Sequence, residues 1–146
     1  MKISTRGRYA LRMLIDIAEN QEKGFVALKD ISIRQNISKK YLEQIVPLLN
    51  TAGFLTAGRG FMGGYKINGR LSAYTVADIL RTTEGSLAPV ACLENEENIC
   101  ERMGMCDTLY IWKGLMEVME NYLEDITLAD IINRKNRNKN DDYVLL

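Results

Sequence analysis

The sequence predicts a mainly α-helical fold with a small β-hairpin wing: a winged helix-turn-helix domain followed by a long C-terminal helix. Two short amphipathic segments, residues 28–35 and 38–52, are joined by a tight turn, which is the pattern of a helix-turn-helix. Two β-prone runs around a glycine-rich tip follow within residues 54–67, as a wing requires. Residues 107–125 then carry apolar side chains at helical spacing over a long stretch, which predicts the C-terminal helix.

The first three helices are predicted from periodicity and capping residues. Apolar side chains at helical spacing predict a first helix from Ser4 to Asn20 and a second from Leu28 to Gln35. Asn36-Ile37 forms the turn between the second helix and the third. Ser38 is a favoured N-cap for a third helix that runs to about Ala52. Pro47 lies inside this helix, so a local kink is expected there.

The wing and the fourth helix follow directly. Residues 54–57 and 65–67 are β-prone, and four of the seven residues in the tip between them, 58–64, are glycine. This composition is typical of a hairpin. The sequence Thr75-Val76-Ala77-Asp78 places a hydroxyl and a carboxylate at the spacing of a capping box, which predicts that the fourth helix begins there.

The remaining chain divides into a loop, a helical part and a tail. We expect residues 1–84 to form the winged domain, 85–106 a cysteine-bearing acidic loop, and 107–132 a dimerisation helix followed by a short helix that ends at Ile132. Residues 133–146 are rich in asparagine and lysine, and we expect them to form a mobile tail.

Charge and composition narrow the function. The 146 residues have no net charge, but residues 1–81 hold thirteen basic and six acidic side chains, and residues 82–146 hold the reverse balance, six and thirteen. This asymmetry indicates that the basic half, residues 1–81, carries a surface that binds nucleic acid. The chain has no histidine, which removes the histidine-dependent catalytic triads. We therefore expect a cytoplasmic protein that is not an enzyme, has no small-molecule substrate and does not contact a membrane.

The third helix is the expected DNA-reading element. A recognition helix presents its N-terminal polar residues to base edges in the major groove. Polar residues at the beginning of a helix are more often an ordinary solvated face. Here the adjoining wing favours DNA binding over that alternative. Arg59 lies among glycines that permit close approach to a narrow minor groove. The expected DNA-binding residues are Ser38, Lys39, Lys40, Tyr41, Glu43, Gln44 and Arg59.

Three cysteines are the second signal. Cys92, Cys100 and Cys106 lie within fifteen residues of an acidic, mostly polar loop, so they cannot all be core residues. Thiolates are the usual ligands of iron-sulfur clusters and of structural zinc. Zinc would need a fourth cysteine or histidine, which the chain lacks. The three residues are therefore expected to ligate an iron-sulfur cluster.

Several runs carry a resemblance to a known family: Met1–Ala10, Ile37–Ile45, Arg59–Tyr65, Leu80–Gly85 and Ile126–Ile131, together with three cysteines before a tryptophan-bearing helix. With these runs the chain, over residues 1 to about 132, resembles the winged-helix iron-sulfur transcription regulators typified by IscR and NsrR. The resemblance implies a homodimer in which the long helix crosses that of its partner. It also implies a cluster whose presence or state selects the promoters that are bound.

The chain departs from the IscR type at its cluster ligands. Seven residues separate Cys92 from Cys100, a longer gap than in that type, and Leu109 stands where its ligand histidine would be. Arg8 stands where some NsrR-type members carry an acidic ligand. The fourth ligand and the nuclearity, 2Fe-2S or 4Fe-4S, therefore stay open, with local candidates at Asp107, Glu101 and Glu94–Glu97. A sister branch that controls cysteine metabolism lacks the three cysteines, and their retention argues against that role.

The long helix is expected to form the dimer interface, because it is apolar on more than one side and follows a domain that already has a core. The expected interface residues are Trp112, Met116, Met119 and Leu123. The predicted function is a homodimeric repressor that binds a double-stranded operator and senses cluster status. One alternative is a nitric oxide- or redox-sensing repressor of the same fold. Another is a metal-binding or redox protein without specific DNA binding.

Overall fold

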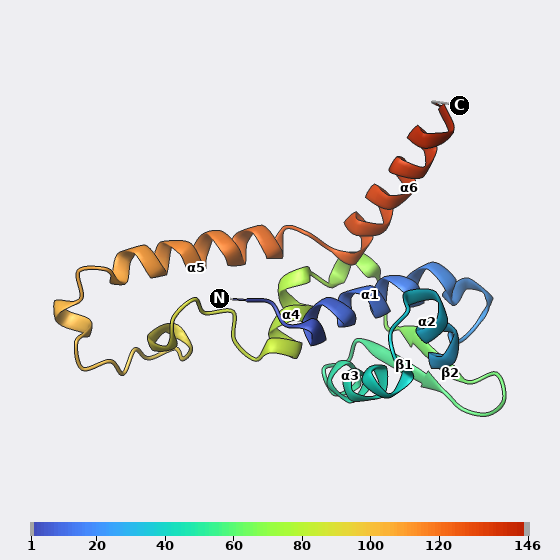
Figure 1. Ribbon diagram of the computed structural model, residues 1–146, viewed down its shortest axis with the longest axis horizontal. Coiled ribbons are helices and arrows are strands. Elements are labelled where there is room, and N and C mark those ends of the chain that lie inside the picture. The colour runs from blue at the N-terminus through green and yellow to red at the C-terminus, as the bar shows by residue number, and fades with distance from the viewer. Residues whose placement is uncertain (1, 145–146) are drawn as a thin grey trace.

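The computed structural model describes residues 2–144 and has the predicted winged helix-turn-helix architecture with a long C-terminal helix. Short 3-10 turns lie at Gln21–Lys23, Leu71–Ala73, Ala91–Leu93 and Met103–Met105. The main elements, labelled in Figure 1, are α1 (Thr5–Asn20), α2 (Leu28–Gln35), α3 (Lys39–Thr51), β1 (Leu55–Gly58), β2 (Gly64–Ile67), α4 (Val76–Glu84), α5 (Leu109–Glu124) and α6 (Leu128–Val144).

The core is built around α1. This helix contacts α2, α3, α4, β2 and α6, because its apolar stripe faces the interior along its whole length. Ala10, Met13, Leu14 and Ile17 are fully inaccessible to solvent. Against them pack Val26, Ile31, Ile37, Leu42, Ile45, Val46, Leu49, Phe54, Leu55, Ile67, Ile79 and Leu128. The basic half of the sequence thus folds around one hydrophobic core.

The beginning of α1 is fastened to the end of α4. The Ser4 hydroxyl caps α1 by accepting from the Gly7 backbone N–H, and it donates to the Glu84 carboxylate at 2.6 Å. The Ser4 backbone N–H donates to the same carboxylate oxygen. A Cβ at Gly7 would run into this oxygen and come within 3.0 Å of Leu80. Gly7 therefore allows the two helices to approach this closely.

The wing is an antiparallel hairpin in the register Leu55 to Ile67 and Gly58 to Gly64. Val26, in the segment before α2, forms an isolated antiparallel bridge with β2: it exchanges two backbone hydrogen bonds of 2.9 Å with Tyr65. Gly64 is in a left-handed conformation, and a Cβ there would collide with the Val26 backbone. This close approach ties the tip-proximal end of β2 to the segment before α2.

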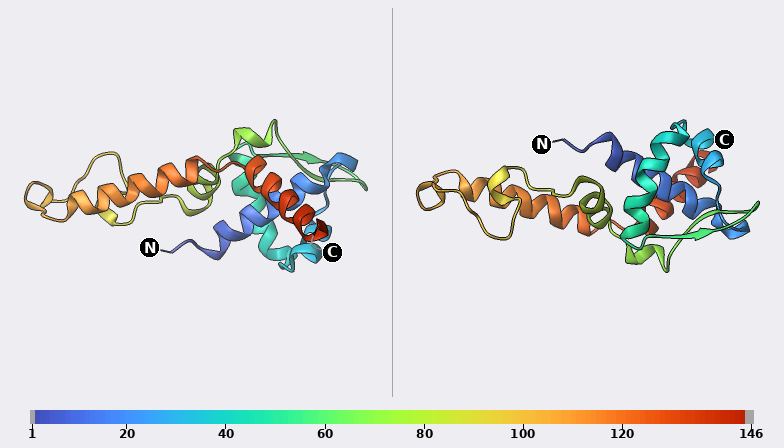
Figure 2. Two further views of the ribbon diagram at one scale, coloured as in Figure 1. Left: turned by 90° about the horizontal axis from the view of Figure 1, so that it is seen from above. Right: turned by 90° about the horizontal axis from the view of Figure 1, so that it is seen from below.

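Residues 85–108 run outward from the winged domain, and the long helix α5 returns alongside them (Figures 1 and 2). None of its residues is buried. Its C-terminal end is attached to α4, because Leu123 joins a small apolar cluster with Leu80. Arg81 of α4 pairs with Glu124 at 2.6 Å and with Glu120 at 3.4 Å. The opposite end of α5 lies far from the core.

Helix α6 is longer than the sequence predicted. It begins at a capping box formed by Thr127 and Asp130 and continues to Val144, so the expected end at Ile132 is wrong. The polar composition that suggested a tail is compatible with a helix that is anchored at one end: Leu128 is fully buried, and Lys135 pairs with Glu19 of α1 at 2.6 Å. Residues 145–146 of the expected tail lie outside the described residues. In the part of the chain that the structure describes, no helix has the length and hydropathy that crossing a bilayer demands.

Candidate nucleic-acid interface and cysteine-bearing loop

The turn between α2 and α3 is fixed by local hydrogen bonds. Asn36 ends α2 in a left-handed conformation with φ of 51°, which asparagine tolerates better than most residues. Ile37 is buried, and its backbone carbonyl accepts from the Ser32 hydroxyl at 2.6 Å. The Ile37 backbone N–H in turn donates to the Ser32 carbonyl at 3.2 Å. The angle between α2 and α3 is therefore held by a buried anchor and a fixed turn.

Helix α3 presents a polar face at its beginning. Ser38 caps it by accepting from the Tyr41 backbone N–H at 3.1 Å. The buried residues of α3 are Leu42, Ile45, Val46 and Leu49, and the predicted polar DNA-binding residues Ser38, Lys39, Lys40, Glu43 and Gln44 are all exposed. The structure thus places these five on the solvent side of the first turns, where a recognition helix presents its side chains.

Tyr41 differs from the other predicted residues of α3, because it is half-buried. Its ring packs edge-on against Tyr9 of α1, with centroids 5.2 Å apart. Lys39 and Glu43 approach to 3.9 Å, but both are more than half exposed, and such a pair contributes little to stability. The two side chains are therefore available to a ligand, whereas Tyr41 serves as a contact between α1 and α3.

Arg59 is exposed at the tip of the wing. The tip is closed by a hydrogen bond of 3.0 Å from the Gly63 backbone N–H to the Gly60 carbonyl, and Gly60 has φ of 90°. A Cβ at Gly63 would come within 2.6 Å of the Gly58 carbonyl oxygen. Phe61 and Met62 are also exposed at this tip. The glycines make the tip narrow, and Arg59 extends from it beside two apolar side chains.

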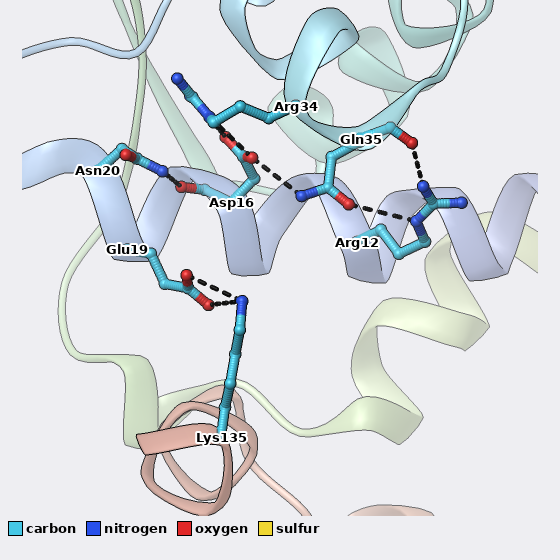
Figure 3. Close-up of polar contacts among 7 residues, drawn as sticks. All are labelled: Arg12, Asp16, Glu19, Asn20, Arg34, Gln35 and Lys135. Atoms are coloured by element: carbon cyan, nitrogen blue, oxygen red, sulfur yellow. Dashed lines mark hydrogen bonds and ion pairs between the residues drawn. The ribbon is translucent and has the colours of Figure 1, made fainter. Parts of the chain in front are cut away.

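A polar network missed by the sequence analysis joins α1 to α2 (Figure 3). The Asp16 carboxylate is only 3% exposed. It accepts from the Arg34 guanidinium at 2.7 and 3.0 Å and from the Gln35 side-chain amide at 2.9 Å. The hydrogen bond to Asp16 raises the pKa of Arg34 above its ordinary value. A signal was present in the sequence: Asp16 falls three residues after Met13 on the apolar stripe of α1, and a charge in a buried position needs partners.

The same network reaches the solvent side of α1. The Arg12 guanidinium donates to the Gln35 side-chain oxygen at 3.3 Å and to the Gln35 backbone carbonyl (Figure 3). It also lies over the ring of Tyr9, 5.2 Å from the centroid, which is a favourable cation–π distance. Contacts therefore run without a break from Asp16 to the aromatic pair that supports the beginning of α3.

The three predicted ligands lie along the loop that leads to α5. Cys92 is half-buried in the 3-10 turn at Ala91–Leu93, and Cys100 and Cys106 are exposed. All three are free thiols. Within residues 2–144, nowhere do three cysteine or carboxylate side chains gather as a metal ion would require. The structure therefore does not bring the three thiols together, and it selects none of the candidate fourth ligands.

The donor set still fits an iron-sulfur cluster by its chemistry. Three thiols with no disulfide partner stand in a loop that contributes only Leu87 to the buried core, so ligation would displace few packing contacts. The Cys106 sulfur and the Thr108 hydroxyl are 3.6 Å apart, and this hydrogen bond lowers the pKa of the thiol. Deprotonated sulfur is the form that binds iron.

Helix α5 has a broad apolar side made of two adjoining rows. The predicted interface residues form one row and are half-buried, since the row faces α4 and the loop. The other row contains Ile111, Val118 and Tyr122, which are 44%, 68% and 66% exposed. A groove of about 280 Å³ adjoins both rows, and it is lined by Lys2, Ile3, Leu80, Met119, Tyr122 and Leu123. The second row is therefore an exposed apolar surface made of neighbouring side chains on one side of the helix.

Residues 3–134 match the Rrf2 family, described as "Iron-dependent Transcriptional regulator". The chain is 40% identical over 132 residues to protein rrf2 of Nitratidesulfovibrio vulgaris, covering 90% of this chain and 87% of that relative. The structure of CymR, the global cysteine regulator of B. subtilis, superposes with a TM-score of 0.74 at 36% identity, covering 92% of this chain and 98% of CymR. T. potens IscR gives a TM-score of 0.73 at 31% identity, covering 92% and 88%.

Proposed function

Because the chain belongs to the Rrf2 family of iron-dependent transcriptional regulators, we propose that it is a homodimeric repressor that reads a palindromic operator through α3 and the wing. Relatives of this family carry the names of transcriptional regulators, not of enzymes. The observation that carries the proposal is the exposed polar face at the beginning of α3, held rigidly against α1 and α2. A fixed helix with a free polar N-terminal face is what major-groove readout requires.

Five exposed side chains of α3 and the wing have proposed roles. Gln44 pairs with adenine and Glu43 accepts from cytosine, because these side chains match the hydrogen-bonding edges of those bases. Lys39 and Lys40 contact phosphates, which contributes affinity without sequence preference. Arg59 enters the minor groove beside the site read by α3, where a narrow groove concentrates negative potential.

Cys92, Cys100 and Cys106 are the proposed ligands of an iron-sulfur cluster. The family description names iron, and IscR is among the relatives. The free thiols and the sparse packing of the loop support the assignment. A bound cluster supplies chemistry that responds to iron, oxygen or nitric oxide. The chain itself contributes the thiolates and an acidic loop whose order depends on ligation.

The proposed homodimer forms through α5. The half-buried row of Trp112, Met116, Met119 and Leu123 and the exposed row beside it would both meet the partner's α5, as apolar helix faces do in dimer interfaces. Two-fold symmetry would present two copies of α3 to two half-sites of one operator. The homodimer therefore accounts for a long apolar helix that its own domain leaves uncovered.

The DNA-reading part is tested by comparing Gln44→Ala with Lys40→Gln on cognate and scrambled duplexes. Gln44→Ala is expected to cost about 1–3 kcal/mol on the cognate duplex and to relax its preference. Lys40→Gln should weaken binding to both duplexes and lower the salt slope by about one unit. Unchanged preference in Gln44→Ala would show that α3 is not the reading helix.

The cluster part is tested on an anaerobic preparation by visible absorption and Mössbauer spectroscopy, which also report the nuclearity. Replacing the three cysteines together with alanine should abolish the iron-dependent absorption, keep the dimer, and change operator affinity by roughly 5- to 150-fold. Equal affinity of the cluster-bearing and triple-alanine proteins for every operator would refute the sensor role. Cluster loss under nitric oxide, compared with loss under iron starvation, separates the two signals.

A further inference from the structure

We infer that Asp16 is a positioning residue for DNA readout: its buried carboxylate clamps the end of α2 and thereby fixes the beginning of α3 relative to α1. This inference rests on the proposed function, because it concerns how α3 meets the bases. No other charged side chain among the described residues is as buried as Asp16. A buried charge is costly unless it is fully paired. A carboxylate in the apolar stripe of α1 is therefore expected to have a specific role.

The clamp holds two consecutive residues at the end of α2. Arg34 binds both carboxylate oxygens of Asp16 through its Nε and terminal nitrogen, with distances from 2.7 to 3.2 Å. Gln35, the last residue of α2, donates to the same carboxylate at 2.9 Å. The two-pronged contact of a guanidinium with a carboxylate constrains direction as well as distance. Asp16 therefore restricts both rotation and sliding of α2 on α1.

Gln35 passes this constraint on to α3 by two routes. Along the chain, only Asn36, Ile37 and Ser38 separate it from the first residue of α3, and the turn they form is fixed. Through space, Gln35 holds the Arg12 guanidinium. Arg12 lies over Tyr9, whose ring supports Tyr41 in the first turn of α3.

The constraint matters because base readout depends on hydrogen bonds with narrow limits. A donor and an acceptor must approach to about 2.7–3.2 Å with good alignment, whereas a lysine on a phosphate tolerates displacement because its charge acts over a longer range. Loosening α3 should therefore reduce discrimination between sequences and leave general affinity for duplex DNA in place. This separation distinguishes a positioning role from a simple contribution to stability.

The test is the ratio of dissociation constants for scrambled and cognate duplexes, measured by fluorescence anisotropy on the full-length protein. Asp16→Asn keeps the shape of the side chain and removes its charge. We expect the ratio to fall about tenfold, comparable to the loss of one base contact, with an unchanged salt slope. Partial unfolding would lower the competent fraction and weaken both duplexes by the same factor, so it cannot change the ratio.

Glu19→Gln is the matched control. Glu19 lies on the same helix one residue before Asn20 and pairs with Lys135 of α6, away from α2 (Figure 3). Its loss should leave the ratio at the wild-type value. If Asp16→Asn does not fold, Gln35→Ala provides the same test. It removes the side-chain contacts of Gln35 with Asp16 and Arg12, keeps the bond from Arg12 to the backbone carbonyl of residue 35, and leaves the Arg34 pair intact.

The outcomes separate this inference from the proposed function. A lower ratio in Asp16→Asn or Gln35→Ala, with Glu19→Gln unchanged, supports the clamp. A wild-type ratio in both clamp variants, while Gln44→Ala loses discrimination, would overturn the clamp and leave α3 as the reading helix. Retained discrimination in Gln44→Ala would overturn the proposed readout itself. An equal fall in Glu19→Gln would show that the effect belongs to α1 in general and would also overturn the clamp.

Discussion

The dimer proposal makes a quantitative prediction at Tyr122 of α5. This side chain is 66% exposed in the single chain. A fully covered aromatic side chain buries roughly 150–250 Å², so a partner helix over Tyr122 would remove roughly 130 Å² from water. At about 25 cal/mol per Å² this contributes about 3 kcal/mol in each protomer. Because a two-fold interface counts the residue twice, Tyr122→Ala should lose about 6 kcal/mol and raise the dimer dissociation constant roughly 10⁴-fold.

The assay is sedimentation velocity over a concentration series, with circular dichroism to show that the helices remain. Tyr110→Ala is the matched control: Tyr110 is 75% exposed on the same helix but lies about 120° around the helix axis from Tyr122, at about 100° per residue. The assignment of the exposed apolar row to the interface would be refuted if Tyr122→Ala dimerised like the wild type. It would also be refuted if Tyr110→Ala dissociated and Tyr122→Ala did not.

Three further outcomes are expected. Gly7→Ala should lower the free energy of unfolding by roughly 1–3 kcal/mol in urea denaturation, because the new Cβ meets the Glu84 carboxylate. Arg59→Ala should weaken binding more on duplexes with A/T-rich flanks than on G/C-rich ones, as gel-shift titrations would show. Hydrogen bonds from the Thr127 backbone and hydroxyl lower the pKa of Asp130 in the folded protein. Asp130 therefore stabilises α6 fully above the pKa that it has in the unfolded chain, and this stabilisation is lost as the pH falls through its folded pKa. Circular dichroism should show this loss, and Asp130→Asn should lack it.

Local signals in the sequence predicted most of the winged domain. The cap residues Ser38 and Thr75 and the turn at Asn36 act within a few residues, so α2 and α3 have the expected bounds, and α4 the expected beginning, to within a residue or two. The sequence predicts too short a helix at α6, because its polar composition is also typical of disordered segments. Its support comes from Glu19, more than a hundred residues away, and no local pattern encodes such a contact.

The candidate site was predicted unevenly for the same reason. The exposed residues of α3 follow from helical periodicity, since the buried stripe leaves only one side for them. The Asp16 clamp depends on partners eighteen and nineteen residues away, and periodicity indicates only that Asp16 is buried. Tyr41 was assigned to DNA contact, but its half-buried ring packs on Tyr9, so any role in binding would act through the position of α3.

If α5 forms the proposed dimer interface, its exposure in the single chain would tie the order of this helix to the concentration of the protein. The winged domain has its own core, whereas α5 buries none of its residues in the single chain. In the proposed dimer, mass action would govern the order of α5: as protomers become scarce, amide protons of α5 should exchange faster while those of α1 keep their protection. A cell that makes few copies would hold folded winged domains with a partly unfolded α5. A cell that makes many copies would hold complete dimers. Copy number would then act as an input in its own right, beside whatever the cysteine-bearing loop detects.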